Sequence, residues 1–393
     1  MTLAELRTHL PLLQKMTWLN AAASSPTPLP VYEAMTAYLK ETLESGDVRY
    51  PAWARFKDEV RARLARFIGA TPREVGFTPS TSFGFHVIAQ LVKARGITEV
   101  LTLETEFPST TLPMLYDGLT LRAARMRADG TYPLADLEAA LTPKTGAIAV
   151  SAVQYASGFR IDLEAVSALA RSRVLTFIIN AAQGLGHVPL DVKKLGAHFL
   201  AATSHKWFMA GYGTGMLFID QTWLDTAPLP FGGWLSVQPQ EQFQPWVNAS
   251  LVDDAHGFTA TGTKFRREAS ALEAGGGSWV GLYGVDAALA LHEAIGPVVA
   301  LEHIVSLQLK LRARLRTAGF KPTTPDDPAT LSGICVIPVQ GAPLEVVRAL
   351  LREADVATTA RGAGVRISTH AWNDETDLDH LLSALTRLGI KPG

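Results

Sequence analysis

The stretch that decides the fold runs from Phe199 to Phe218 and reads FLAATSHKWFMAGYGTGMLF. Its apolar start, Phe199 to Ala202, predicts a buried strand, and a glycine-rich turn from Gly211 to Gly215 leads into a second one. Lys206 lies in the polar turn that ends the first strand, where burial disfavours its charge. A lysine with a lowered pKa is the group that Schiff-base chemistry with an aldehyde cofactor needs. The alternative is an ordinary solvated lysine in a loop.

Length and composition predict a globular enzyme of two domains. The chain has 393 residues, of which 47% are apolar and 19% charged. The 36 basic and 37 acidic residues balance, so we expect neither a nucleic acid nor a membrane surface as partner. The single cysteine, Cys335, excludes an internal disulfide framework and a multi-cysteine metal site. The first residues lack the apolar core of a signal peptide, and we expect a cytoplasmic protein.

Short apolar runs alternate with helical patterns from residue 74 to residue 220. The expected strands are Val75–Phe77, Val100–Leu103, Leu121–Met126, Ile148–Val150, Leu175–Ile179, Phe199–Ala202 and Met216–Ile219. The expected helices between them include Phe83–Ala94, Leu134–Leu141 and Leu163–Ser172. This rhythm predicts an α/β fold with a mostly parallel seven-stranded sheet, which binds its ligands at the carboxyl ends of the strands.

The rhythm breaks near Thr222 and gives way to a long irregular segment. We expect this segment, with Phe231 to Trp234 and Trp246, to wall a pocket or a subunit interface. The elements expected beyond it are helices at Trp279–Ile295, Val298–Ala318, Leu344–Glu353 and Thr376–Leu388, and strands at Ile334–Val339 and Val365–Ser368. We therefore predict a large domain over residues 16–262 and a smaller α+β domain over residues 263–393, joined by an N-terminal segment, residues 1–15.

Several short sequence motifs occur in an order and spacing that are informative together. They are Leu19-Asn20-Ala21-Ala22, Phe77-Thr78-Pro79-Ser80-Thr81-Ser82, Glu106-Phe107-Pro108-Ser109, Asn180-Ala181-Ala182-Gln183, Ser204-His205-Lys206, Glu273-Ala274-Gly275-Gly276 and Val365-Arg366-Ile367-Ser368. With them the chain resembles, over nearly its whole length, the aminotransferase class V family of fold-type I pyridoxal-phosphate (PLP) enzymes. That family includes cysteine desulfurases, selenocysteine lyases, kynureninase and isopenicillin-N-epimerase-like proteins. The resemblance implies PLP as the cofactor and makes Lys206 the catalytic Schiff-base lysine.

A phosphate site is expected where the first predicted strand meets its helix. Thr81 and Ser82 open that helix, so their amides and hydroxyls can hold a phosphate, although a plain helix cap uses the same residues. By resemblance, Thr203 and His205 join them, although His205 has packing as its alternative role. Many relatives have, at Gly276, a threonine that reaches the phosphate of the neighbouring subunit, and here backbone amides would serve instead.

The resemblance also assigns the residues around the cofactor ring. Phe107 would stack on one face and Ala182 pack against the other, while Gln183 would bond the phenolic oxygen. Phe107 has an ordinary core position as its alternative. Asn180 stands where the family carries an aspartate that pairs with the protonated pyridine nitrogen, and a neutral amide cannot hold that charge as a carboxylate does.

A substrate anchor is expected at Arg366, because a buried arginine in an apolar strand needs an anion. By resemblance it binds the α-carboxylate of a small amino-acid substrate, with Asn20 in a weaker role, and a structural salt bridge is the alternative. Desulfurases carry a cysteine shortly before this strand, but Ala357 to Gly364 has none and Cys335 looks buried. We therefore expect an enzyme that is not a persulfide-forming cysteine desulfurase.

The expected reaction is transamination, β-elimination (C–S lyase) or epimerisation. The sequence does not distinguish among these three reactions. The alternative is a non-catalytic or inactivated PLP-binding protein, which Asn180 favours. Members of the family are generally dimers with the active site at the subunit interface. The resemblance therefore implies a homodimer.

Overall fold

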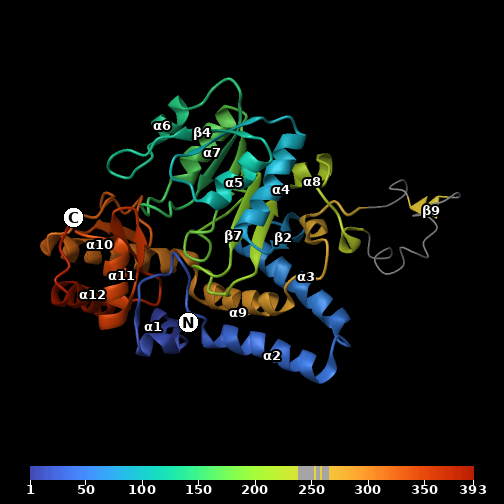
Figure 1. Ribbon diagram of the computed structural model, residues 1–393. Coiled ribbons are helices and arrows are strands. Elements are labelled where there is room, and N and C mark those ends of the chain that lie inside the picture. The colour runs from blue at the N-terminus through green and yellow to red at the C-terminus, as the bar shows by residue number, and fades with distance from the viewer. Residues whose placement is uncertain (238–251, 254–256, 259–264) are drawn as a thin grey trace.

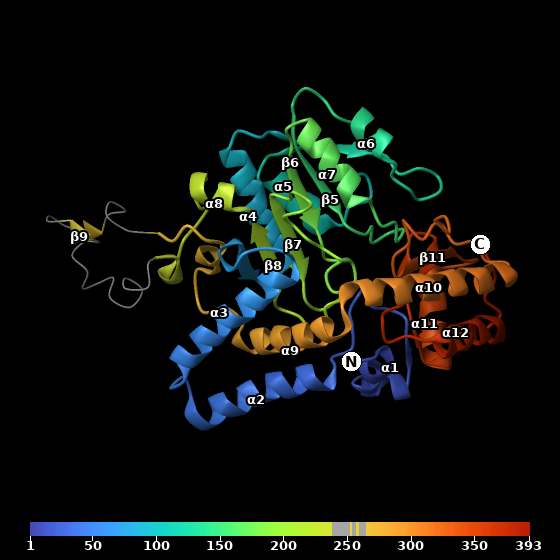
Figure 2. The same ribbon diagram turned by 180° about the vertical axis from the view of Figure 1, so that it is seen from behind.

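A seven-stranded sheet forms the centre of the computed structural model, which describes residues 1–237, 252–253, 257–258 and 265–393 (Figures 1 and 2). Its strands are β2 (Val75–Thr78), β3 (Glu99–Leu103), β4 (Thr120–Ala124), β5 (Thr145–Ser151), β6 (Thr176–Asn180), β7 (Phe199–Thr203) and β8 (Gly215–Ile219). The strand order is β2-β8-β7-β6-β5-β3-β4, and only β8 runs antiparallel to its neighbours. The fold predicted from the apolar rhythm is confirmed.

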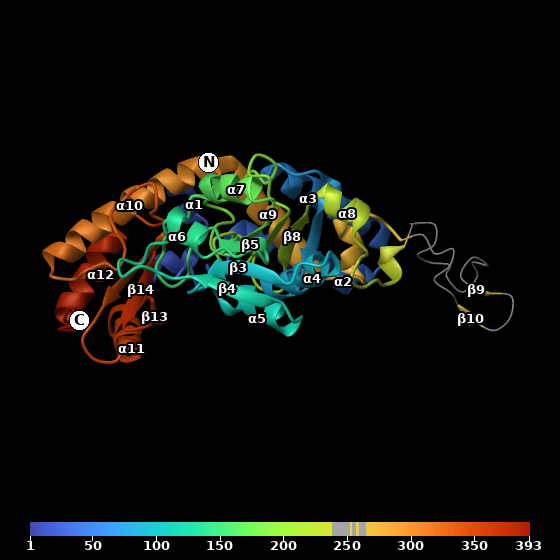
Figure 3. The ribbon, with the colours of Figure 1, turned by 90° about the horizontal axis from the view of Figure 1, so that it is seen from above.

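The sheet separates two apolar cores because successive side chains of a strand point to opposite faces. In β6, Ile178 packs with α4 in one core, while Phe177 and Ile179 pack with α3 and α7 in the other. The helices concerned are α3 (Tyr50–Phe67), α4 (Thr81–Ala94), α5 (Pro108–Tyr116), α6 (Leu134–Ala139) and α7 (Leu163–Ser172). Figure 3 shows α4 and α5 on one side of the sheet and α7 on the other. This burial on both faces explains why the strands read as continuous apolar runs.

A smaller sheet lies toward the C-terminus, with strand order β11-β14-β13 and antiparallel pairing throughout. Its elements are β11 (Ile334–Pro338), α11 (Pro343–Ala354), β12 (Val356–Ala357), β13 (Thr359–Arg361), β14 (Gly364–Ser368) and α12 (Glu375–Arg387). The long helix α10 (Pro297–Thr317) reaches this unit from α9 (Trp279–Ile295) (Figure 2). Helix α9 begins beyond the predicted domain boundary at residue 262, yet it packs against α2 (Leu29–Ser45) and α3 of the predicted large domain. The boundary stays a prediction.

No single helix in the described part of the chain is long and apolar enough to cross a membrane. Helices α9 and α10 pass that test only as a pair, by length and composition, and the pair is bent by 75°. A further short helix, α8 (Gln221–Thr226), follows β8 at the start of the segment that the sequence left irregular. Trp246 lies outside the described residues.

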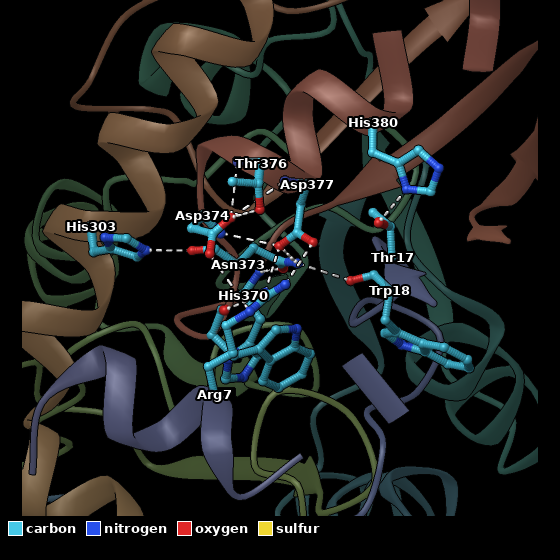
Figure 4. Close-up of polar contacts among 11 residues, drawn as sticks. Arg7, Thr17, Trp18, His303, His370, Asn373, Asp374, Thr376, Asp377 and His380 are labelled. Atoms are coloured by element: carbon cyan, nitrogen blue, oxygen red, sulfur yellow. Dashed lines mark hydrogen bonds and ion pairs between the residues drawn. The ribbon is translucent and has the colours of Figure 1, made fainter. Parts of the chain in front are cut away.

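The N-terminal segment packs against the C-terminal unit. Strand β1 (Thr17–Trp18) pairs in parallel with β12, and Arg7 of α1 (Leu3–Thr8) bonds Asp377 of α12 and the carbonyl oxygen of Trp372. In Figure 4 the Asn373 amide also lies at this junction, where it donates to Asp377 and to the Trp18 carbonyl oxygen. After these contacts the chain passes directly to the sheet edge where the candidate site lies.

Candidate active site

A cavity of about 340 Å³ opens at the carboxyl ends of the parallel strands. It brings together most of the residues predicted from the sequence, namely Thr81, Ser82, Phe107, Ala182, Gln183, Thr203, His205, Lys206 and Arg366. Ser80, which precedes Thr81 at the start of the same helix, also lines it, as do residues that received no role from the sequence, namely Ala22, Ala23, Ser109, Tyr155 and Arg361. Asn20, Asn180 and Gly276 are not among the residues that line it. The cavity thus lies where the rule that ligands bind at strand ends places a site, although that rule did not supply all of its walls.

Lys206 follows β7 and lines this cavity half-buried, with its Nζ 5.3 Å from the centroid of the Phe107 ring. Burial, followed by the positive charges of Arg366 and Arg361, lowers the pKa of Lys206 to about 8. No acidic side chain stands among the described residues that line the cavity. The amine is therefore placed to lose its proton near neutral pH, as a nucleophilic lysine must.

The N-terminus of α4 forms one end of the cavity. Ser80 caps this helix by accepting from the Phe83 amide at 3.2 Å, whereas Thr81 Oγ1 is buried without a hydrogen-bond partner. Thr203 Oγ1 lies 2.8 Å from Nδ1 of His205, whose pKa is lowered to about 4 by burial and by Lys206. Free helical amides beside an unpartnered hydroxyl suit a phosphate, so this end fits the cofactor that the sequence implied.

Gln183 is held beside Lys206 by two bonds that the sequence did not predict. Its Oε1 accepts from Trp207 Nε1 at 2.7 Å, and its Nε2 donates to the Ala22 carbonyl oxygen at 2.9 Å. One hydrogen of the amide nitrogen is left for a ligand oxygen. Trp207 is fully buried, so this bond fixes the Gln183 side chain. The geometry therefore accommodates the predicted bond to a phenolic oxygen.

Asn180 lies at the end of β6, buried beneath the residues that line the cavity. Its Oδ1 accepts from the Ala182 amide at 2.9 Å, and its Nδ2 donates to Thr110 Oγ1 at 2.7 Å. Thr110 Oγ1 in turn lies 3.3 Å from a carboxylate oxygen of Glu106, a fully buried residue whose pKa burial raises. Sequence reasoning assigned no role to Glu106 or Thr110. The amide of Asn180 is therefore oriented by a carboxyl group two hydrogen bonds away.

Arg366 lies in β14 and donates through Nη1 to the Tyr155 carbonyl oxygen at 3.2 Å. Its Nε and Nη2 are buried without a partner, and burial lowers its pKa to about 9. The salt bridge that stood as the alternative reading does not form within the described part of the chain. An arginine buried in this way is prepared to take an anion from the cavity.

Two predicted site residues lie elsewhere in this single chain. Asn20 accepts a hydrogen bond from the hydroxyl of Thr359, which directs its side chain toward β13. Gly276 follows Glu273, whose carboxylate is buried in ion pairs with Lys57 and Arg61. The role expected of Gly276 depends on a neighbouring subunit and stays a prediction. Likewise, Phe231, in the segment expected to wall the site, lines a separate cavity of about 360 Å³.

This fold and this site define a fold-type I PLP enzyme. The chain belongs to the aminotransferase class-V family, whose model matches residues 17–384. It is 31% identical over 237 residues to a probable cysteine desulfurase of Methanothermobacter thermautotrophicus, and the match covers 58% of this chain and 59% of that protein. It is 22% identical over 379 residues to the uncharacterized aminotransferase YcbU of Bacillus subtilis, with 95% of each chain covered.

Solved structures resemble this chain over nearly its whole length. The apo cysteine desulfurase from Thermococcus onnurineus NA1 superposes with a TM-score of 0.85 at 24% identity, covering 98% of this chain and 97% of that one. The cystine C–S lyase C-DES, in complex with its product cysteine persulfide, has a TM-score of 0.82 at 21% identity, covering 96% and 98%. PLP is linked to glycine in a mutant of that lyase. The cofactor predicted from the sequence is confirmed by the family and these structures.

The exclusion of a cysteine desulfurase was wrong. It relied on a loop without cysteine before β14 and on Cys335, which is indeed fully buried in β11. Several relatives found by sequence are nevertheless named probable cysteine desulfurase, and structures that resemble this chain include cysteine desulfurases. One residue type missing from one loop is weak evidence beside a backbone and a family model that match nearly the whole chain. The exclusion of desulfurase-type chemistry is therefore withdrawn.

Proposed function

We propose that this protein uses PLP held by Lys206 to cleave a carbon–sulfur bond in a small amino acid. The observation that carries the proposal is one cavity that contains Lys206, with its pKa lowered to about 8, and Arg366, with two unpartnered nitrogens. The relatives named cysteine desulfurase and cystine C–S lyase support this choice of bond. Because the match spans about three fifths of the length of the first curated relatives, their activity enters here as a proposal.

Nine residues of the cavity have a proposed part in this chemistry. When bound, the cofactor withdraws electrons from the bonds at the substrate's Cα. Arg366 binds the α-carboxylate with its planar fork and so sets which bond lies along the cofactor's π system. Lys206 takes the Cα proton and returns one, because its lowered pKa suits transfer near neutral pH. The remaining proposed contacts are Thr81, Ser82, Thr203 and His205 to the phosphate, Phe107 and Ala182 to the ring faces, and Gln183 to the phenolic oxygen.

Asn180 favours loss of a β-substituent over transamination or epimerisation. A neutral amide stabilises negative charge at Cα less well than the family's aspartate does. When a sulfur leaving group departs from Cβ, it carries this negative charge away. The reaction therefore depends less on charge stabilisation by the residue at position 180. The same asparagine, together with Gly276, favours the alternative of an inactivated PLP-binding protein.

We further propose a cytoplasmic homodimer. Large apolar side chains are exposed on α2 and α5, including Leu43, which is 86% exposed, and Tyr116, which is 85% exposed. Exposed apolar side chains of this size are typical of a surface that a second copy of the chain covers. In such a dimer the glycines near Gly276 would offer amides to the partner's phosphate site. Sedimentation of the holoprotein is expected to give a dimer, and a monomer that still binds PLP tightly would contradict this part of the proposal.

The test of the proposed function is the fate of the cofactor and of each substrate. Purified holoprotein is incubated with a pool of proteinogenic amino acids and cystine, and the products are followed by mass spectrometry while the cofactor is followed by absorbance. We expect pyruvate, ammonia and a sulfur-containing product from an elimination, or alanine where a thiol in the mixture accepts the sulfur as a persulfide, and PLP retained. Pyridoxamine phosphate with a keto acid would indicate transamination instead, and D-amino acids would indicate epimerisation. No conversion of any amino acid would favour the inactivated protein.

A further inference from the structure

The cavity holds more positive charge than one α-carboxylate balances. Lys206, Arg366 and Arg361 all line it, and no acidic residue stands among the described residues of its wall. The proposed phosphate site lies at the far end, at the N-terminus of α4, with hydroxyls and amides of its own. If Arg366 takes the α-carboxylate, Arg361 remains without an anion.

Arg361 is held at the cavity by the hairpin of β13 and β14, in which it lies opposite Gly364. Its guanidinium carbon is 5.7 Å from the centroid of the Tyr155 ring, and Tyr155 packs edge-on against Phe107 with 5.0 Å between ring centroids. Lys206 Nζ lies 5.3 Å from the centroid of the Phe107 ring, so a series of contacts through two aromatic rings connects Lys206 with Arg361. The guanidinium and the reacting amine thus line one cavity, which the side chain of a substrate must share.

The hydrogen-bonding capacity of Arg361 is largely unused. Its Nη1 donates to the carbonyl oxygen of its neighbour Ala360 at 3.0 Å, and its Nε is shielded from solvent without a partner. The charge of Arg361 contributes to the lowered pKa values of both Arg366 and Lys206, so the three cations act on one another. A cation kept among like charges with unused donors is costly unless an anion arrives with the ligand.

We propose that Arg361 binds a second acid group, carried by the side chain of the substrate. The substrate class is then an amino acid whose side chain ends in a carboxylate or another acid, with Arg366 on the α-carboxylate and Arg361 on the distal acid. This inference rests on the proposed function only for the role of Arg366. Charge-assisted contacts of guanidinium with an acid group are among the strongest polar contacts in proteins, and they therefore set specificity.

The test compares two unreactive acids of equal chain length, succinate with two carboxylates and butyrate with one. Binding of each to the holoprotein is measured by calorimetry for the unaltered chain, for Arg361→Gln and for the control Arg348→Gln. Arg348 is an exposed arginine on α11, paired with Glu345 at 2.6 Å. We expect succinate to bind about tenfold tighter than butyrate or better, the size of one charge-assisted contact. Arg361→Gln should remove this preference while leaving the affinity for butyrate unchanged, and Arg348→Gln should retain it.

Three results would overturn the inference. They are equal affinity of the unaltered chain for both acids, failure of succinate to bind, and an equal loss of both affinities in Arg361→Gln. The last result would mean that Arg361 shares the α-carboxylate with Arg366. Because neither acid can react, this outcome is separate from the turnover experiment. A protein that discriminates between the acids but converts no amino acid overturns the proposed function alone.

Discussion

Replacing Lys206 with methionine is expected to stabilise the apoprotein, because it removes a buried charge and shortens the unbranched side chain by only one atom. The pKa of Lys206 falls from 10.5 to about 8, mainly through burial. At about 1.36 kcal/mol per pKa unit, this difference of about 2.5 costs the folded apoprotein about 3 kcal/mol at pH 7. Between pH 8 and 10.5 the unfolded chain binds more protons than the folded one, so stability rises with pH across this window. Below pH 8 the cost is fully present.

The assay is urea unfolding of the apoprotein at pH 7 and at pH 10. Lys206→Met should exceed the unaltered protein by about 3 kcal/mol at pH 7 and by less than about 1 kcal/mol at pH 10. Lys194→Met is the control, because the side chain of Lys194 is 85% exposed and its removal should change little at either pH. Equal stability of Lys206→Met and the unaltered protein at pH 7 would refute the reasoning, as would a gain that does not shrink with pH.

Three further changes test other parts of the structure. Glu273→Gln leaves Lys57 and Arg61 buried without their carboxylate and should cost about 3 to 5 kcal/mol in urea unfolding, against less than about 1 kcal/mol for the exposed Glu345→Gln. Asn180→Asp should raise any transaminase rate, measured as formation of pyridoxamine phosphate, because a carboxylate stabilises the protonated pyridine nitrogen. Lys206→Ala should abolish the absorbance of the cofactor–lysine Schiff base, measured in the purified protein.

Each of these three predictions would be contradicted by a specific result. A loss for Glu273→Gln no larger than that of the exposed control would mean that the buried ion pairs contribute nothing. No gain in Asn180→Asp would mean that the asparagine does not limit proton chemistry. An unchanged absorbance in Lys206→Ala would mean that another group carries the cofactor.

The sheet could be predicted because its strands are buried on both faces and read as uninterrupted apolar runs. Strand β7 was expected at Phe199–Ala202 and is found at Phe199–Thr203. Helix α9 was expected and found at Trp279–Ile295. The position of Lys206 followed from the same pattern, since parallel strands direct their ends, and the residues after them, to one edge.

The inner supports of the site could not be predicted, because they depend on side chains brought together from distant segments. Glu106 reaches Asn180 only through Thr110, and Gln183 meets Trp207 across 24 residues of sequence. Nothing in the local pattern around these residues marks such a bond. Arg361 was passed over for a similar reason, since its place beyond Tyr155 depends on how the β13–β14 hairpin meets the large sheet.

The most direct test of the central claim is to identify the lysine that carries the cofactor. Holoprotein is reduced with borohydride, which fixes PLP to its amine, then digested and mapped by mass spectrometry. We predict the pyridoxyl label on the peptide that contains Lys206, and on no other lysine in significant amount. A label on another lysine, or protein that binds PLP but remains unlabelled after reduction, would contradict the account.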